Sequence, residues 1–548
     1  MRVFPEFIEN LEMHGEQQEV DTTAEIKSRR TFAIISHPDA GKTTLTEKFL
    51  LYGGAINLAG SVKGKATARH AVSDWMEIEK QRGISVTSSA LQFHYNGACV
   101  NILDTPGHQD FSEDTYRTLM AADCAVMVID ASKGVEAQTK KLFKVCTMRH
   151  IPIFTFINKL DREALDTFAL MEDIENHLGI ETCPVNLPIG SGAQFKGIYE
   201  RKSRQIVMYE DTQKGTKEGT EHRIDLSDTG RAREAVGEEA LALLLEELEL
   251  FDGAGADFDL TAVREGRLTP VFFGSALQNF GVGIFLRAFL EMAPEPAGRF
   301  SEGQIIDPLT DDFSAFVFKI QANMNKAHRD RIAFFRICSG RYDAEDEVAH
   351  TQSGRTLRLS QPQTLIANER KILKEAYAGD IIGVFDPGLF SIGDTICTPG
   401  KSIRYEGIPT FAPEHFARVR QIDTMKRKQF VKGIEQIAQE GAIQIFHEPD
   451  SGLEEIIVGV VGVLQFEVLK FRLENEYNVE IAMDALPYEY IRWVDSDTDL
   501  KTLSGTSDMK KVTDLKGRPL LLFINEWSVN MTLERNPGLI LTEFKNNA

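Results

Sequence analysis

A stretch near the N-terminus combines the residue types that hold a polyphosphate. It reads Ser36-His37-Pro38-Asp39-Ala40-Gly41-Lys42-Thr43-Thr44. It follows the apolar run 31–35, so a strand, a tight loop and a helix start are expected in that order. In such a loop, backbone N–H groups and the positive end of the helix face the phosphates. Gly41 lets the backbone approach, Lys42 reaches the β- and γ-phosphates, and the hydroxyl of Thr43 is a ligand for Mg²⁺. Ser36 stands where such loops usually carry their first glycine.

A second group of polar residues follows the apolar run 98–103. It reads Asp104-Thr105-Pro106-Gly107-His108. Beside a phosphate-binding loop, a carboxylate at a strand end holds Mg²⁺, often through water, and a glycine N–H contacts the γ-phosphate. An Asp-x-Pro-Gly turn is also common in proteins of every kind. Its place downstream of the Gly-Lys-Thr loop favours a phosphate-sensing role for Asp104 and Gly107.

Two further groups indicate which base the site holds. The first reads Asn158-Lys159-Leu160-Asp161, and the second reads Gly274-Ser275-Ala276-Leu277. The carboxylate of Asp161 can accept hydrogen bonds from the ring N1–H and the exocyclic amine of guanine, a donor pair that adenine lacks. The backbone of residues 275–277 can contact the guanine carbonyl. Either tetrapeptide alone is typical of a solvated turn, but the ordered set predicts a guanine-nucleotide site.

Alternating strands and helices are expected to position these groups. Residues 53–83 carry little apolar periodicity and are expected to form a long mobile segment. Asn96-Gly97 is then a strong hairpin signal between two strands. The expected elements are strands 86–95 and 98–103, helix 111–122, strand 125–130, helix 138–149, strand 151–157 and strand 269–273. This order predicts an α/β domain with a mostly parallel, doubly wound sheet, whose carboxyl edge binds ligands.

Shifts in composition along the chain predict several domains. We expect a flexible leader at 1–25, a nucleotide-binding domain at 26–295 with an inserted subdomain at about 185–268, a β-barrel domain at 305–400 and an α+β domain at 412–548. The insertion is expected because residues 181–271 are too many for one βα unit. Its apolar run 238–250 reads as a core-facing amphipathic helix. In the last domain, the predicted order of strands and helices fits a split-βαβ sandwich.

Composition argues against several classes of protein. The 548 residues carry a formal net charge of −21, which speaks against a general nucleic-acid coat. No run of about 18 uncharged apolar residues occurs, so no membrane span is expected. The six cysteines are scattered without a Cys-x-x-Cys pair. That scatter argues against zinc and disulfide frameworks and favours a reduced, cytosolic chain.

One basic cluster stands out against this acidic background. Its members are Arg418, Arg420, Lys426, Arg427, Lys428 and Lys432. Contact with an RNA backbone is one interpretation, and it implies a salt-dependent affinity. A solvated helix face is the other, and the sequence favours neither over the other.

In this order, the four groups resemble the GTP-binding domain of translational GTPases. The specific mark is His108, directly after Gly107. Gln81-Arg82-Gly83-Ile84-Ser85 is similar to the switch I motif of that family, which usually has threonine in place of the serine. The resemblance implies GTP and GDP as ligands, with Mg²⁺ held by Thr43, Ser85 and Asp104. It also implies that His108 positions the attacking water and that Ile84 shields it until ribosome contact.

Over nearly the whole chain, the order of nucleotide domain, barrel and sandwich resembles the bacterial class II peptide-chain release factors. The likeness implies a monomeric cytoplasmic protein, without a membrane partner, that binds ribosomal RNA and proteins after peptide release. There it would promote departure of the class I release factors, and GTP hydrolysis would let it leave. Elongation factor G and the ribosomal protection proteins share the motifs but need roughly 100 to 150 further residues. A GTPase of that type remains an alternative, as does a nucleotide-regulated RNA- or ribosome-binding module without useful hydrolysis.

Overall fold

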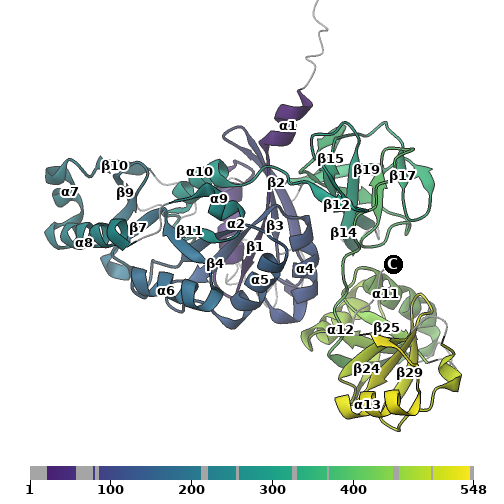
Figure 1. Ribbon diagram of the computed structural model, residues 1–548. Helices are drawn as coiled ribbons and strands as arrows, with labels where there is room; N and C mark the ends of the chain where they lie inside the picture. The colour runs from purple at the N-terminus through teal and green to yellow at the C-terminus, as the bar shows by residue number, and fades with distance from the viewer. Residues whose placement is uncertain are drawn as a thin grey trace, which may run out of the picture.

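The computed structural model divides into an N-terminal α/β domain, a curled β domain and a C-terminal α+β domain (Figure 1). It describes residues 21–56, 78–79, 85–210, 220–254, 258–323, 330–366, 369–448, 456–494 and 498–542. The expected leader and most of the expected mobile segment therefore lie outside the described residues. Within the described part of the chain, no helix is long and apolar enough to cross a membrane.

A seven-stranded sheet forms the centre of the N-terminal domain. Its spatial order is β2-β3-β1-β4-β5-β11-β6, and every neighbouring pair is parallel except β2 with β3. The strands are β1 Arg29–Ser36, β2 Ser89–Tyr95, β3 Ala98–Asp104, β4 Cys124–Asp130, β5 Ile153–Asn158, β6 Glu181–Pro184 and β11 Leu268–Phe273. Every residue of β4 is buried, as expected for a strand of a parallel sheet that is covered on both faces. The predicted doubly wound sheet is confirmed.

Helices cover both faces of this sheet. They are α2 Lys42–Tyr52, α4 Ser112–Ala121, α5 Ala137–Met148, α6 Thr167–Leu178, α9 Leu260–Arg264 and α10 Val282–Met292. The short helix α1 Thr22–Ser28 precedes β1 and instead buries Ile26 among the core residues of the curled β domain. The helix expected from residue 111 is preceded by a single 3₁₀ turn, η1 Gln109–Phe111. Between α2, α10 and the sheet, the rings of Phe49, Phe285 and Phe289 stack in sequence. Such aromatic packing fixes α2, and with it the loop that precedes α2.

A lobe with its own four-stranded antiparallel sheet leaves the domain after β6 and returns at β11 (left in Figure 1). Its elements are β7 Asn186–Ile189, β8 Gly197–Glu200, β9 Gln205–Tyr209, β10 Glu221–Asp225, α7 Thr229–Val236 and α8 Glu238–Ala254. Helix α8 buries Leu241, Leu244 and Leu248, which are spaced as one helical face. The expected core-facing helix at 238–250 is therefore confirmed.

The middle domain is a curled antiparallel β structure. Its eight-stranded sheet has the order β18-β17-β23-β14-β15-β22-β19-β20. The central strands β14 Ser314–Ala322 and β15 Arg331–Ser339 are buried along their whole lengths. The other strands of this sheet are β17 Val348–His350, β18 Arg355–Leu357, β19 Ser360–Ile366, β20 Glu369–Ile372, β22 Ile381–Phe385 and β23 Thr395–Cys397. Two separate two-stranded sheets accompany it. One pairs β12 Arg299–Ser301 with β13 Gln304–Ile306, and the other pairs β16 Arg341–Asp343 with β21 Glu375–Tyr377.

The C-terminal domain is built on a second eight-stranded sheet. Its first half follows the predicted split-βαβ order: β24 His415–Gln421, α11 Arg427–Gln439, β25 Gln444–His447, β26 Ile456–Val460, α12 Leu464–Tyr477 and β27 Ile481–Leu486. The second half consists of β28 Tyr490–Val494, β29 Met509–Asp514, β30 Pro519–Phe523, α13 Glu526–Arg535 and β31 Leu541–Thr542. These later strands extend the same sheet beyond β25, so the chain after Trp493 is an integral part of this domain.

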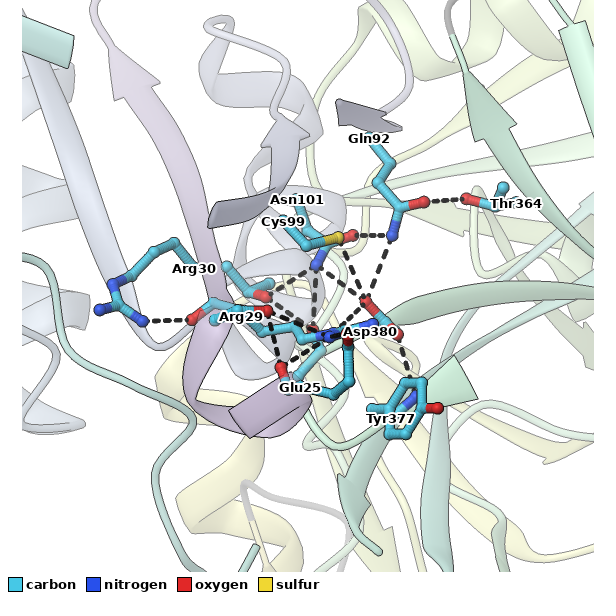
Figure 2. A network of polar contacts seen from close by, with 12 residues as sticks. Glu25, Arg29, Arg30, Gln92, Cys99, Asn101, Thr364, Tyr377 and Asp380 are labelled. Atoms are coloured by element: carbon cyan, nitrogen blue, oxygen red, sulfur yellow. Dashed lines mark hydrogen bonds and ion pairs between the residues drawn. The ribbon is translucent and has the colours of Figure 1, made fainter. Parts of the chain in front are cut away.

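Buried polar contacts join the curled β domain to the α/β domain. Figure 2 shows Asp380, at the start of β22, facing Arg29, Gln92 and Asn101 of the first domain. Nearby, the guanidinium of Arg336 donates to Asp123 at 2.6 Å, and both side chains are only 1% exposed. Because removing one partner would leave a buried charge unpaired, such pairs hold the two domains in one arrangement.

Candidate functional site

The phosphate loop lies between the end of β1 and the start of α2, as predicted. Gly41 caps α2 with φ at +99°, a conformation that side-chain-bearing residues rarely adopt. A Cβ at this position would collide with Nδ2 of Asn158. That same amide group donates to the carbonyl oxygen of Ala40 at 2.8 Å. Residues 37–41 therefore form a tight turn between β1 and α2, and the side chain of Asn158 holds this turn through a hydrogen bond to Ala40.

The groups expected around the phosphates and Mg²⁺ come together beside this loop. The ammonium of Lys42 contacts Oδ1 of Asp104, and both side chains are buried. The other carboxylate oxygen of Asp104 is buried without a hydrogen-bond partner among the described residues. The hydroxyl oxygens of Thr43 and Ser85 lie 3.5 Å apart. Hydroxyl and carboxylate oxygens are the hard ligands that Mg²⁺ prefers, so these three side chains fit the predicted metal.

The segment after β3 is anchored to the sheet and placed against the phosphate loop. The hydroxyl of Thr105 donates to the carbonyl of Ile34 on β1 at 2.6 Å. The carbonyl of Pro106 accepts from Thr115 of α4 at 3.1 Å. A Cβ on Gly107 would come within 3.4 Å of the backbone of Pro38, which shows how closely the two loops approach. Residues 104–108 therefore lie where they can respond to what the phosphate loop holds.

The ring of His108 follows directly and is partly exposed, with 31% of its side chain accessible. Its Nδ1 faces Asp110, which offers a backbone N–H at 3.2 Å and a carboxylate oxygen at 3.1 Å. The imidazole is thus held through one nitrogen. Residues 81–84 of the expected switch I motif, including Ile84, lie outside the described residues, whereas Ser85 is described.

The two base-recognition groups form one surface at the same edge of the sheet. Oδ1 of Asn158 accepts from the N–H of Ala276 at 2.8 Å. The hydroxyl of Ser275 donates to Oδ1 of Asp161 at 2.5 Å, and the side chain of Asp161 remains 12% exposed. Leu160 is buried, whereas Leu277 is exposed beside them. This arrangement holds a carboxylate at the end of the loop pair, where it can accept from the donor edge of a guanine.

Two roles at this site were not suggested by the sequence. Asn158 bridges the phosphate loop and the 274–277 loop through its two amide atoms. Asp130, at the end of β4, accepts from the ammonium of Lys159 at 2.7 Å. Although burial opposes ionisation, hydrogen bonds from Lys159 and Ser132 lower the pKa of Asp130 below its usual value. The place of Asp130 at a strand's carboxyl end was the signal that could have identified it.

The basic cluster lies on the C-terminal domain, at β24 and the start of α11. Arg420, Arg427, Lys428 and Lys432 are exposed, while Lys426 is partly buried. Arg418 is half-buried and pairs with Glu448 at 3.4 Å. The exposed members present positive charge to solvent, as either of the two interpretations requires.

The fold and this site together define a class of protein. Residues 27–295 match the family model described as "Elongation factor Tu GTP binding domain". Residues 312–399 match "Elongation factor G domain 2". A guanine-nucleotide site with His108 after its second group, followed by this β domain, is that of a translational GTPase.

The remainder of the chain and its relatives specify the family. Residues 405–533 match "Class II release factor RF3, C-terminal domain". A peptide chain release factor 3 from Symbiobacterium thermophilum is 58% identical over 516 residues, which cover 94% of this chain and 97% of that protein. The peptide chain release factor 3 of Gloeobacter violaceus is 52% identical over 518 residues, covering 94% and 97% respectively. The chain belongs to the peptide chain release factor 3 family.

A solved structure supports the fold alone. A crystal structure of a protein from Thermus thermophilus matches with a TM-score of 0.67 at 22% identity. The match covers 89% of this chain and 72% of that chain. The order of domains is therefore found outside the near relatives.

Substitution of Gly41 by alanine should abolish tight nucleotide binding. The added Cβ would collide with the amide of Asn158, which holds both loops, and would also be strained at positive φ. We expect the Kd for a fluorescent GDP analogue to rise by at least about tenfold, the equivalent of roughly 1.4 kcal/mol. Gly54→Ala is the matched control, because Gly54 has φ of +67° but no atom within 4 Å of the added Cβ. Equal losses in the two variants would show that a general loss of stability, and not the contact of position 41 with Asn158, causes the defect.

Proposed function

We propose that this protein is a ribosome-stimulated GTPase of translation termination that promotes departure of the class I release factors after peptide release. The observation that supports the proposal is that His108 directly follows Gly107, whose backbone approaches Pro38 of the phosphate loop, in a chain whose relatives are named peptide chain release factor 3. GTP is the substrate, GDP and phosphate are the products, and the ribosome with its bound factors is the partner. The proposed place of action is the cytoplasm, and the proposed form is a monomer.

The chemistry assigned to the site rests mainly on charge and position. Lys42 neutralises charge on the β- and γ-phosphate oxygens, and the N–H of Gly107 contacts the γ-phosphate. Thr43, Ser85 and Asp104 would hold a Mg²⁺ ion, which when bound would neutralise further charge on the phosphate oxygens. His108 orients the water that attacks the γ-phosphorus, so its contribution is the placement of one nucleophile.

Contacts between the nucleotide domain and the C-terminal domain would let GTP hydrolysis change the arrangement of the two domains. Val86, next to Ser85, and Phe111, which ends the 3₁₀ turn after the 104–108 segment, form one apolar cluster with Val468 of α12. Both segments expected to respond to the γ-phosphate therefore pack on the same helix of the C-terminal domain. A change in either segment alters this packing, which is how hydrolysis is proposed to change the domain arrangement and release the protein from the ribosome.

Two further features complete the proposal. The exposed basic side chains of the C-terminal domain, Arg420, Arg427 and Lys428, together with Lys426 and Arg418, are proposed to contact ribosomal RNA phosphates. The domain limits proposed here are 26–295 with an insertion at about 185–268, 305–400 and 412–548, after a leader at 1–25.

Replacing His108 by alanine tests the proposed catalytic residue. Among the described residues the imidazole forms no hydrogen bond or ion pair with the phosphate loop, so GTP binding should be retained. Ribosome-stimulated hydrolysis should slow by roughly tenfold or more, the scale of a lost proton-handling group. Multiple-turnover phosphate release on terminated ribosomes is the measurement, and an unchanged rate would contradict the assignment.

Replacing Asp161 by asparagine tests the proposed base. An asparagine amide offers a donor that matches the carbonyl of xanthine in place of the amine of guanine. We expect GTP affinity to fall and xanthosine triphosphate affinity to rise, measured by competition against a fluorescent nucleotide. Retained GTP affinity would show that Asp161 does not recognise the guanine base.

The proposed biological step is tested by dissociation of a labelled class I release factor from terminated ribosomes. We expect the protein to accelerate that dissociation with GTP and with a non-hydrolysable analogue, because binding of the triphosphate form drives it. With the analogue, the protein itself should then remain bound. No acceleration with either nucleotide would contradict the termination function, and acceleration of translocation instead would favour an elongation-type GTPase.

A further inference from the structure

We propose that Asp110 is a positioning residue that couples the docking of helix α12 of the C-terminal domain to the ring of His108. The inference rests on the proposed role of His108. It assigns a residue outside the four nucleotide-binding groups to the same reaction, and it identifies the contact through which the C-terminal domain acts on that reaction.

The two oxygens of the Asp110 carboxylate have different partners. Oδ1 lies 3.1 Å from Nδ1 of His108, and Oδ2 accepts from the backbone N–H of Leu464 at 2.8 Å. Asp110 is 8% exposed, so neither contact is easily replaced by water. A single side chain thus joins the imidazole to the first turn of α12.

Asp110 can hold the imidazole in either neutral tautomer. When Nδ1 carries the proton, it donates to the carboxylate and leaves Nε2 as an acceptor for a proton of the attacking water. When Nδ1 carries no proton, it accepts from the backbone N–H of Asp110, which lies 3.2 Å away. The ring plane is fixed in both cases, and the carboxylate favours the form in which Nε2 can accept.

The start of α12 is shaped to receive this carboxylate. The N–H of Leu464 is one of the groups at a helix start that have no partner within the helix, and negative charge is favoured there. A Cβ on Gly462 would collide with Cγ of Asp110 and would lie 2.5 Å from its Cα. The helix start can therefore approach Asp110 this closely only with glycine at position 462.

Movement of α12 must then disturb the histidine. If the C-terminal domain shifts, Asp110 loses the N–H of Leu464 and with it one of its two anchors. The apolar cluster of Phe111 and Val468 would separate in the same movement. The docked arrangement is thus the one in which the ring of His108 is held for catalysis.

The test compares two variants in two backgrounds of the full-length protein. Asp110→Asn keeps the size of the side chain. Once its amide oxygen accepts from Leu464, however, its NH2 group faces Nδ1 of His108 and favours the tautomer whose Nε2 carries the proton and cannot accept from water. Gly462→Ala displaces the helix start while leaving every nucleotide-site residue intact. Each is made with His108 present and with His108→Ala. Val463→Ala is the matched control, because Val463 adjoins Gly462 and is 56% exposed. The measurements are kcat for GTP hydrolysis, the ribosome concentration at half-maximal rate, and the affinity for a fluorescent GDP analogue.

With His108 present, we expect Asp110→Asn to lower kcat by about tenfold, the scale of a lost charge-assisted hydrogen bond. Gly462→Ala should lower kcat several-fold, and Val463→Ala should leave it unchanged. GDP affinity and half-saturation should stay within about twofold, which shows that the variants are folded and bind. In the His108→Ala background, each variant should change kcat by less than about twofold, because residues that act as one unit are not additive.

Equal losses in both backgrounds would overturn the inference, since Asp110 would then act independently of the histidine. A Gly462→Ala rate equal to that of Val463→Ala would overturn the coupling to α12. A His108→Ala protein as fast as the wild type would instead overturn the proposed catalytic residue, and this inference with it.

Discussion

The side-chain amide of Asn158 is the contact on which the nucleotide site depends. Its Nδ2 donates to Ala40 in the phosphate loop, and its Oδ1 accepts from Ala276 in the 274–277 loop. These loops belong to segments of the chain more than one hundred residues apart. Because an amide has a donor and an acceptor in fixed geometry, it sets the distance between the loops more strictly than either a hydroxyl or a carboxylate would.

A second set of constraints fixes the domains relative to that site. The ion pair of Arg336 with Asp123 and the contacts of Asp380 are buried between the first two domains. Lys319 of β14 lies 3.5 Å from Asp114 of α4, beside the junction with the C-terminal domain. Breaking a buried pair typically costs about 3–5 kcal/mol, so such contacts favour a few discrete arrangements over a continuous range. The C-terminal domain is joined to the same region by backbone carbonyls of Glu440 and Gly441, which accept from Arg117.

Much of the fold followed from local patterns in the sequence. The buried apolar strands and the glycine-containing turns of the nucleotide site have strong signals within ten residues, and the sheet placed their carboxyl ends together. The helix expected at 238–250 could likewise be predicted from the local pattern of apolar residues. Boundaries were less certain: the strand expected from residue 86 begins at Ser89, since the preceding residues are held by side-chain contacts of Glu79.

The contacts between domains could not be read in this way. Asp123 and Arg336 are single charged residues beside apolar runs, and nothing local indicates that they will meet. Asp110 looks like an ordinary acidic residue at a helix start, and its second partner is 354 residues away. Position 462 likewise requires glycine only because α12 packs against Asp110, and the sequence near Gly462 does not show this contact. Long-range pairing of this kind depends on tertiary packing, which single-sequence patterns do not encode.

The lobe between β6 and β11 has a consequence for how the protein is made. Strands β6 and β11 are neighbours in the sheet, yet more than eighty residues of the lobe separate Glu181 from its partner Leu268. β11 also lies between β5 and β6, so the sheet stays incomplete until the lobe has been synthesised. The Ser275–Leu277 loop emerges later still. A nascent chain therefore cannot complete the proposed guanine site, and cannot gain stability from a nucleotide bound there, until roughly half of the protein has left the ribosome that is making it.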